Sequence, residues 1–289
     1  MSIIENAIDR LRRTDLPSRP SVVPSGDRLA SQGTVAHRRI GVDLGVLRAR
    51  GEIPEASEDR RFADYYREIK RPLIARALAA DAKPEARVIL VTSALPADGK
   101  TFTALNLAFS MARERDVSVL LVDADAPKAH LSHSLGVDGE PGLLDALANS
   151  AVDVEAMVLA TDIPGLEVLP AGKATEAVAA ELIGSARMAQ VAARLTALRP
   201  RRLVLMDSSP LLVSSEARAL KQIPGQILMV ARAGKTPRQA LLEAIALVDK
   251  SKLYGLVLNE AHEAGGQGYY GYYGYGDSSG QGGQGGPAG

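Results

Sequence analysis

The sequence predicts an α/β fold, in which a doubly wound, mostly parallel β-sheet is covered by helices on both faces. The central part of the 289-residue chain contains six short runs rich in Val, Ile and Leu, and segments with helical spacing separate them. Runs that are apolar at almost every position are typical of strands buried on both faces, as in parallel sheets. Hydrophobic residues make up 46% of the chain, which is enough for a core of this size.

Charge and composition exclude several classes of protein. The chain has 34 Lys and Arg against 34 Asp and Glu, whereas a protein that binds nucleic acid by neutralising phosphates usually has a basic excess. The absence of Cys excludes a disulfide scaffold, a Cys nucleophile and a Cys zinc site, and four His argue against a His-rich metal centre. No apolar run approaches the ~18 residues that span a bilayer, and the N-terminus lacks the features of a secretory signal. We therefore expect a cytoplasmic protein without a nucleic-acid partner.

The N-terminal part is predicted to consist of a short helix and a linker. Residues 1–13 form an amphipathic pattern, with apolar residues at helical spacing at Ile3, Ile4, Ala7, Ile8 and Leu11. This helix docks either on its own protein or on a membrane protein, and the length of the following segment favours the second interpretation. Residues 14–57 are rich in Pro, Ser, Gly and Arg without sustained periodicity, which predicts a flexible linker.

Residues 58–263 are predicted to form the folded body, in which strands and helices alternate. Strands are expected at 88–92, 117–122, 166–169, 203–206, 226–231 and 253–258. Helices are expected at 58–80, 101–115, 142–149, 181–198, 215–222 and 237–250.

The C-terminal residues 264–289 form a tail of unusual composition. The tail is rich in Gly, holds five of the eight tyrosines and has one charged residue, Asp277. Such a segment buries too little apolar surface to offset the entropy lost on ordering, so we expect it to be disordered. A flexible chain of this length reaches roughly 25–30 Å, far enough to contact a neighbouring protomer.

A phosphate-binding loop is predicted between the first strand of the body and the helix after it. Gly99, Lys100 and Thr101 match the end of the Walker A pattern G-x-x-x-x-G-K-[ST], with Ala94 at the position of its first Gly. Unpaired N–H groups at a helix N-terminus favour phosphate. Lys100 can then reach the β- and γ-phosphates, and Thr101 can ligate Mg²⁺. An ordinary strand–loop–helix turn is the alternative, and it leaves Lys100 unexplained.

Three carboxylates follow two other predicted strands. Asp123 and Asp125 come at the end of one strand, and Asp207 follows another. Ligands of doubly wound sheets lie at the carboxyl ends of the strands, so we expect all three near Lys100. Mg²⁺ prefers such oxygen ligands, and a carboxylate near the γ-phosphate can accept a proton from an attacking hydroxyl. The alternative, a strand-end turn or a helix cap, explains one of these residues better than three.

These motifs resemble those of the bacterial tyrosine kinases. The segment TSALPADGKT is similar to that family's Walker A pattern TSxxP[GA][ED]GK[ST], LLVDAD to its Walker A′ motif and LVLMDSSPLL to its Walker B motif. The tyrosine-rich tail resembles the family's autophosphorylation cluster. Three further segments, SIIENAIDRL, YYREIKRPL and SEARAL, resemble the exosortase-associated tyrosine autokinases that accompany exopolysaccharide gene clusters.

The sequence departs from the family pattern at three places. An Arg usually follows the second Asp of Walker A′, where this chain has Pro127 and Lys128. Ser209 stands where the family's Asp-[ST]-Pro-Pro has its first Pro. The family's oligomerisation motif E-x-x-R-x-x-R has its nearest match in Asp64, Arg67 and Lys70. None of these departures removes a charge that phosphoryl transfer requires.

The resemblance implies a P-loop NTPase fold of the MinD/ParA-like type and an ATP-dependent protein-tyrosine autokinase that regulates exopolysaccharide synthesis or export. It implies ATP and Mg²⁺ as cofactors. The implied catalytic groups are Lys100, Asp123, Asp125 and Asp207. The implied metal ligands are Thr101, Asp123 and Asp207. The implied nucleotide contacts are Pro96, Ala97, Asp98, Gly99, Lys100, Thr101, Phe102 and Asn259, the last at a position where related ATPases contact adenine. The implied phosphate acceptors are Tyr269, Tyr270, Tyr272, Tyr273 and Tyr275.

The resemblance also implies partners. The tail of one protomer is expected to enter the site of another in a homo-oligomer. A membrane protein of the polysaccharide co-polymerase type is expected to activate the chain and to hold it at the inner face of the cell membrane.

Two alternative functions stay open. A ParA/MinD-type ATPase shares the fold, but that family has a lysine five residues before the catalytic one, where this chain has Leu95. Such an ATPase also has no need of five tail tyrosines. The other alternative is a nucleotide-binding scaffold of a polysaccharide machine without catalytic activity, since the Walker A′ and Walker B departures could lower turnover.

Overall fold

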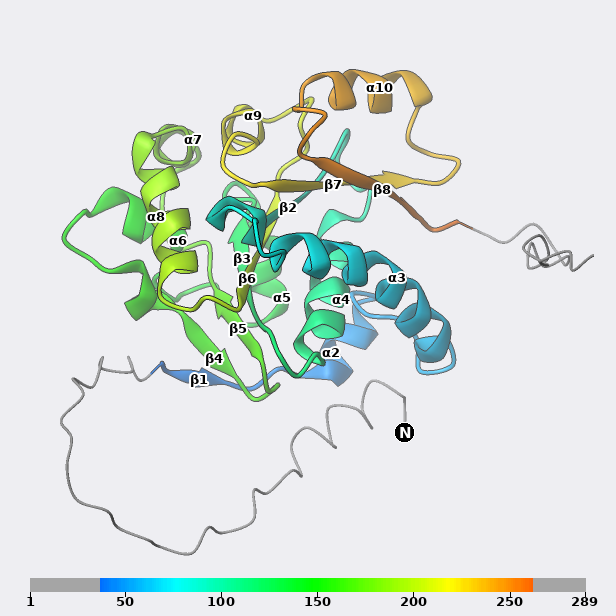
Figure 1. The fold of residues 1–289 in the computed structure, drawn as a ribbon, viewed down its shortest axis with the longest axis horizontal. Helices are drawn as coiled ribbons and strands as arrows, with labels where there is room; N and C mark the ends of the chain where they lie inside the picture. Colours follow the sequence, from blue (N-terminus) through cyan, green and yellow to red (C-terminus); the bar gives the residue numbers. More distant parts are fainter. Residues whose placement is uncertain (1–36, 262–289) are drawn as a thin grey trace, which may run out of the picture.

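The computed structural model describes residues 37–261 (Figure 1). The predicted helix 1–13 and the predicted tail 264–289, with its five tyrosines, lie outside the described residues. Both therefore stay predictions.

The described part of the chain forms an eight-stranded sheet with helices on both faces, which confirms the predicted fold class (Figure 1). The strand order is β1-β4-β5-β3-β6-β2-β7-β8, and every neighbouring pair is parallel except β4 with β5. The strands are β1 Arg39–Ile40, β2 Val88–Ser93, β3 Ser118–Ala124, β4 Leu159–Thr161, β5 Leu166–Leu169, β6 Arg202–Ser208, β7 Gln226–Arg232 and β8 Leu253–Asn259.

Two apolar cores lie on opposite faces of this sheet. The helices are α2 Leu44–Ala49, α3 Asp59–Ala77, α4 Lys100–Ala112, α5 His130–Ser134, α6 Leu143–Ala148, α7 Glu176–Ile183, α8 Ala186–Ala197, α9 Ser215–Leu220 and α10 Arg238–Ala246, with 3-10 turns at Pro84–Arg87 and Val154–Met157. Successive residues of β3 pack in different cores. Leu121 packs with α3 and α4 in the first core, and Leu120 packs with α6 and α8 in the second core. This alternation follows from the period of two in a strand and explains why the central strands are apolar throughout.

Residues 37–57 differ from the predicted linker, so the folded body begins well before residue 58. β1 pairs with β4 at the edge of the sheet, and α2 begins after Asp43, whose side chain accepts a hydrogen bond from the Val46 N–H. Leu47 and Ile53 are buried in the first core. The segment is too short and too polar to show periodicity, and its few apolar residues are buried in the same core as residues of α4.

Two further differences concern short or interrupted elements. The helix expected at 181–198 is two helices, α7 and α8, because the chain is interrupted at Gly184 and Ser185. Glycine is a poor helix former, and serine favours helix N-termini. The three-residue β4 and the five-residue α5 were not expected from the sequence, since each is too short to show a reliable pattern.

Lys70, the last residue of the nearest match to the oligomerisation motif, is buried within the chain. Its ammonium donates to the backbone carbonyl of Ser110 at 2.7 Å and pairs with Glu114 at 2.8 Å. Burial lowers the pKa of Lys70, and Glu114 opposes that shift. Lys70 therefore joins α3 to α4 and is not presented to a neighbouring chain.

None of the helices within 37–261 has the length and apolar character needed to cross a bilayer.

Candidate active site

The loop between β2 and α4 has the tight backbone that a phosphate-binding loop needs. Ala97 and Gly99 both have positive φ, at 64° and 95°. A Cβ at Gly99 would lie 2.0 Å from Nδ2 of Asn259, so only glycine fits there. Nδ2 of Asn259, the last residue of β8, donates to the backbone carbonyl of Asp98 at 3.2 Å. The loop and the end of β8 are therefore packed directly against each other.

Asp98 fixes the loop from within. One oxygen of its carboxylate accepts from the Leu95 N–H at 3.0 Å, and the other accepts from the Thr236 hydroxyl at 2.7 Å. Asp98 is buried, although it belongs to the loop. Its side chain thus closes the turn and ties it to the segment after β7.

The three carboxylates lie at this same edge. In the sheet, Asp123 of β3 stands opposite Asp207 of β6, and Asp207 stands opposite Val91 of β2, the strand that leads into the loop. Asp125 follows β3 directly. Parallel pairing therefore brings the carboxylates and the loop together, as the sequence predicted.

The carboxylates differ in their hydrogen bonds. One oxygen of Asp123 accepts from both the backbone N–H and the hydroxyl of Ser132 of α5, at 2.8 Å and 2.7 Å. Asp125 accepts from the Ser209 hydroxyl at 2.5 Å. Asp207 is fully buried, and neither of its oxygens has a hydrogen-bond partner among residues 37–261.

Burial decides the charge state of these groups. It raises the pKa of Asp207 to about 8; Asp123 and Asp125 add to that rise, and the Thr101 hydroxyl and the Lys100 ammonium oppose it. Burial also raises the pKa of Asp123 to about 6, against the hydrogen bonds from Ser132. The site therefore holds three buried carboxylates, and two of them, Asp123 and Asp207, are harder to ionise than usual.

The donor set fits a magnesium ion that is bound together with phosphate. The buried Asp207 oxygens lack partners within 37–261, and the neighbouring donors are carboxylate and hydroxyl oxygens, which are the ligands that Mg²⁺ prefers. In the described part of the chain, no group of three or more His, Cys, Asp or Glu residues is arranged so that it could hold a metal ion. A metal at this edge would therefore take part of its shell from water and from a phosphate ligand.

The structure brings the predicted site residues of the body together. Residues 96–102 run continuously through the loop into the first turn of α4, and Lys100 and Thr101 are the first two residues of that helix. Lys100 is buried. The ring of Phe102 packs edge-to-face against Phe62 of α3, with 5.9 Å between the ring centroids, so its side chain anchors α4. The acceptor tyrosines lie outside the described residues.

Three residues around the site escaped prediction from the sequence: Ser132, Ser209 and Thr236. Each supplies a hydroxyl that orients an acidic side chain. Thr236 lies far from the motifs in sequence, and Ser132 lies nine residues after Asp123 in a short helix that the sequence did not predict; nothing in the local pattern marks either residue. Ser209 stood out only as a departure from a proline.

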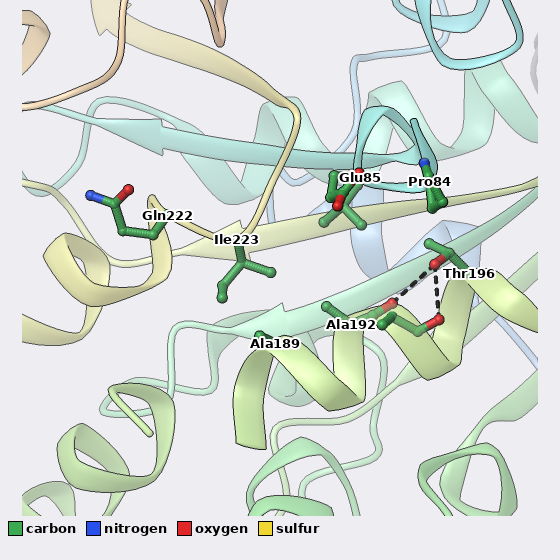
Figure 2. A pocket seen from close by; sticks show the side chains of 9 residues that line it. Pro84, Glu85, Ala189, Ala192, Thr196, Gln222 and Ile223 are labelled. Atoms are coloured by element: carbon green, nitrogen blue, oxygen red, sulfur yellow. Dashed lines mark hydrogen bonds between the residues drawn. The ribbon is translucent and has the colours of Figure 1, made fainter. Parts of the chain in front are cut away.

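The cavity in Figure 2 lies near the first residue of β2, at the end of the sheet opposite the candidate site. Its volume is about 250 Å³, and Val88, the first residue of β2, contributes to its wall. Pro84 and Glu85 line one side, and small residues of α8 such as Ala189 line another (Figure 2). The phosphate-binding loop follows the opposite end of β2, so this cavity is separate from the candidate site.

A family model and several known proteins are similar to this chain. Residues 86–252 match the family model described as an AAA domain. The chain is 32% identical over 174 residues to the tyrosine-protein kinase YwqD of Bacillus subtilis, covering 59% of this chain and 71% of YwqD. It is 30% identical over 175 residues to the tyrosine-protein kinase ptk of Acinetobacter johnsonii, covering 60% of this chain. It is 31% identical over 207 residues to the succinoglycan biosynthesis transport protein ExoP of Rhizobium meliloti, covering 69% of this chain. The matches span only 23% of ptk and 25% of ExoP.

Solved structures point the same way. The kinase domain of the Escherichia coli tyrosine kinase ETK superposes with a TM-score of 0.52 and 27% identity, over 68% of this chain and 85% of that domain. The cell division ATPase MinD of Pyrococcus furiosus has a TM-score of 0.51 at 23% identity, over 60% of this chain and 71% of MinD, and shows the shared fold alone. The chain thus belongs to the AAA-domain family and to the bacterial tyrosine-protein kinases.

Proposed function

We propose that this chain is an ATP-dependent protein-tyrosine autokinase that phosphorylates the tyrosines of its own C-terminal segment. The observation that carries the proposal is the meeting of the GKT loop with three buried carboxylates at one sheet edge, where Asp207 has no hydrogen-bond partner among residues 37–261. The similarity to named tyrosine-protein kinases supports phosphoryl transfer as the use of that edge.

The loop and the start of α4 are proposed to hold the nucleotide. Lys100 neutralises charge on the β- and γ-phosphates, and the amides of residues 96–102 donate to the phosphate oxygens. Asn259, packed against Gly99, borders the position of the base.

Thr101, Asp123 and Asp207 are proposed to hold Mg²⁺. The ion neutralises charge on the transferred phosphoryl group when it is bound. A bound cation also stabilises the ionised form of Asp207, whose pKa burial raises to about 8 in its absence. This gives the unpaired, buried carboxylate a function that the fold alone does not explain.

As the alternative to a metal-binding role, Asp123 is proposed to take the proton from the acceptor tyrosine. Ser132 holds one of its carboxylate oxygens, so the position of the other oxygen is defined relative to β3. Burial raises the pKa of Asp123 to about 6, which suits a base that works near neutral pH. Asp125 supports the same site from the end of β3.

The proposed acceptors are Tyr269, Tyr270, Tyr272, Tyr273 and Tyr275. They follow β8 in sequence, and the last residue of β8 lies against the loop. The tail therefore leaves the described fold at the edge that carries the proposed site. We propose that it enters the site of a neighbouring protomer in a homo-oligomer.

The proposed biological role is the regulation of exopolysaccharide synthesis or export. The similarity to a succinoglycan biosynthesis transport protein supports it. The proposal includes a membrane activator of the polysaccharide co-polymerase type and a position at the inner face of the membrane.

The proposal is tested by incubating the purified chain with Mg-ATP and mapping phosphotyrosine by mass spectrometry. We expect phosphate on the tail, and none in a Lys100→Met variant or in a variant with all five tail tyrosines changed to Phe. ATP hydrolysis without phosphotyrosine would favour a ParA/MinD-type ATPase, and binding without either product would favour a scaffold. A negative result is to be repeated with the cytoplasmic segment of the activator.

A further inference from the structure

We infer that Ser209 is a positioning residue that fixes Asp125 beside the proposed metal site; this deepens the proposed function and rests on it. Ser209 follows β6 directly, and Asp125 follows β3, the neighbouring strand. Both side chains are buried. The Ser209 hydroxyl donates to Oδ1 of Asp125 at 2.5 Å, so a neutral side chain from one strand end orients a carboxylate on the next.

Ser209 is itself held by the strand that leads into the phosphate-binding loop. Its backbone carbonyl accepts from the Thr92 hydroxyl of β2 at 3.1 Å and from the Ser208 hydroxyl at 3.3 Å. Two residues further on, the Leu211 N–H donates to the Ser93 carbonyl at 2.9 Å. These bonds fix the backbone around Ser209 relative to β2, the strand that leads into the loop.

Asp125 depends on this hydroxyl for its orientation. Its backbone is fixed by the Lys128 and Ala129 N–H groups, which donate to its carbonyl at 3.0 Å and 2.8 Å. Its carboxylate, by contrast, receives its side-chain hydrogen bond from Ser209. Without that donor, the carboxylate is free to change rotamer within a site where Asp123 and Asp207 repel it.

The division of donors among the three carboxylates gives Ser209 a specific effect. Ser132 holds Asp123, Ser209 holds Asp125, and Asp207 keeps both oxygens unpartnered among residues 37–261. Ser209 thus orients Asp125 next to Asp207, the proposed cation ligand, and its hydroxyl does not itself bond to Asp207. Residues that orient the groups around a metal typically change metal affinity by about 10–100-fold when mutated.

The test compares Ser209→Ala with a matched control, Ser214→Ala. Ser214 is another buried serine after β6, and its hydroxyl accepts from the Ala217 N–H at the start of α9, away from the carboxylates. Binding of a fluorescent ADP analogue to the full chain is titrated without Mg²⁺ and with increasing Mg²⁺, and thermal unfolding is recorded for each variant.

We expect Ser209→Ala to raise the Mg²⁺ concentration for half-maximal enhancement of ADP binding about ten-fold, with Mg²⁺-free ADP binding unchanged. Ser209→Thr, which keeps the hydroxyl, is expected to retain the wild-type value, and so is Ser214→Ala. Equal Mg²⁺ dependence in Ser209→Ala and wild type, or an equal shift in both Ala variants, would overturn the inference alone. A wild-type chain that binds no ADP would overturn the proposed function and this inference with it.

Discussion

Asp207 is a buried carboxyl group that lowers the stability of the folded protein when it is ionised and that is proposed to bind a cation. It is fully buried at the end of a central strand. Neither carboxylate oxygen makes a hydrogen bond of ordinary geometry within 37–261, although the Thr101 hydroxyl and the Lys100 ammonium lie close enough to favour its ionised form. The sequence predicted its position from one rule, that ligands gather at the carboxyl ends of parallel strands. The sequence did not predict the serine hydroxyls that orient its neighbours. The Ser132 contact depends on the short helix α5, and the Ser209 contact joins residues that are 84 positions apart in the chain.

Asp207→Asn is expected to stabilise the protein in the absence of metal and nucleotide. Burial raises the folded-state pKa to about 8, against 3.8 as the ordinary value, so the unfolded chain loses this proton first. The free energy of unfolding of the wild type therefore falls as pH rises between these two values. The variant is expected to lack this slope and to be more stable at pH 7 by on the order of 1–3 kcal/mol.

Urea unfolding at a series of pH values checks this prediction, and Mg²⁺-dependent ADP binding is expected to be lost in the same variant. A wild-type stability that stays flat or rises from about pH 4 to 8, relative to Asp207→Asn, would contradict it.

Gly99 is important for the backbone geometry of the phosphate-binding loop. Its φ is 95°, which strains any residue that has a Cβ, and that Cβ would lie only 2.0 Å from the Asn259 side chain, so a larger residue must displace Asn259. Gly99→Ala is expected to weaken ADP binding at least about ten-fold and to lower stability by about 1–3 kcal/mol. Gly136→Ala is the matched control, because Gly136 also has a positive φ, 68°, but no atom lies within 4 Å of its Cβ position. Equal loss of ADP binding in both variants would show that the loop geometry has no special role.

At the scale of elements, the long apolar strands could be predicted and the short elements could not. Each of the six expected strands is present with its ends shifted by two residues or fewer. Their signal is strong because both faces are buried. β4, α5 and the segment with β1 and α2 are short, and they are ordered by contacts with parts of the fold that local sequence does not reveal.

The segment 37–57 is expected to contribute to stability despite its linker-like composition. Leu47 of α2 is 1% exposed within the first core, whereas its neighbour Val46 is 42% exposed. Leu47→Ala is expected to lower the free energy of unfolding by about 2–5 kcal/mol, and Val46→Ala by less than about 0.5 kcal/mol. Urea unfolding measures both. A similar small effect for the two variants would mean that α2 does not dock in solution.

At the scale of the whole molecule, parallel topology explains why the site exists. Because β2, β3 and β6 run in the same direction side by side, one sheet edge receives the loop and all three carboxylates. The convergence of the site could be predicted from the alternation of strands and helices. The strand order could not, since nothing in one sequence states which strands are neighbours.

The central claim is that this edge donates a phosphoryl group to tail tyrosines, and a mixing experiment tests it most directly. One chain carries Lys100→Met with its tail intact, and the other keeps Lys100 but has all five tail tyrosines changed to Phe. The two are incubated together with Mg-ATP, with each alone as control, and tail phosphotyrosine is measured by mass spectrometry. We expect phosphotyrosine on the Lys100→Met chain in the mixture and none in either chain alone. A mixture without phosphotyrosine, under conditions where the wild-type chain is modified, would contradict transfer between protomers, and a wild-type chain that never acquires phosphotyrosine, even with its activator segment, would contradict the central claim.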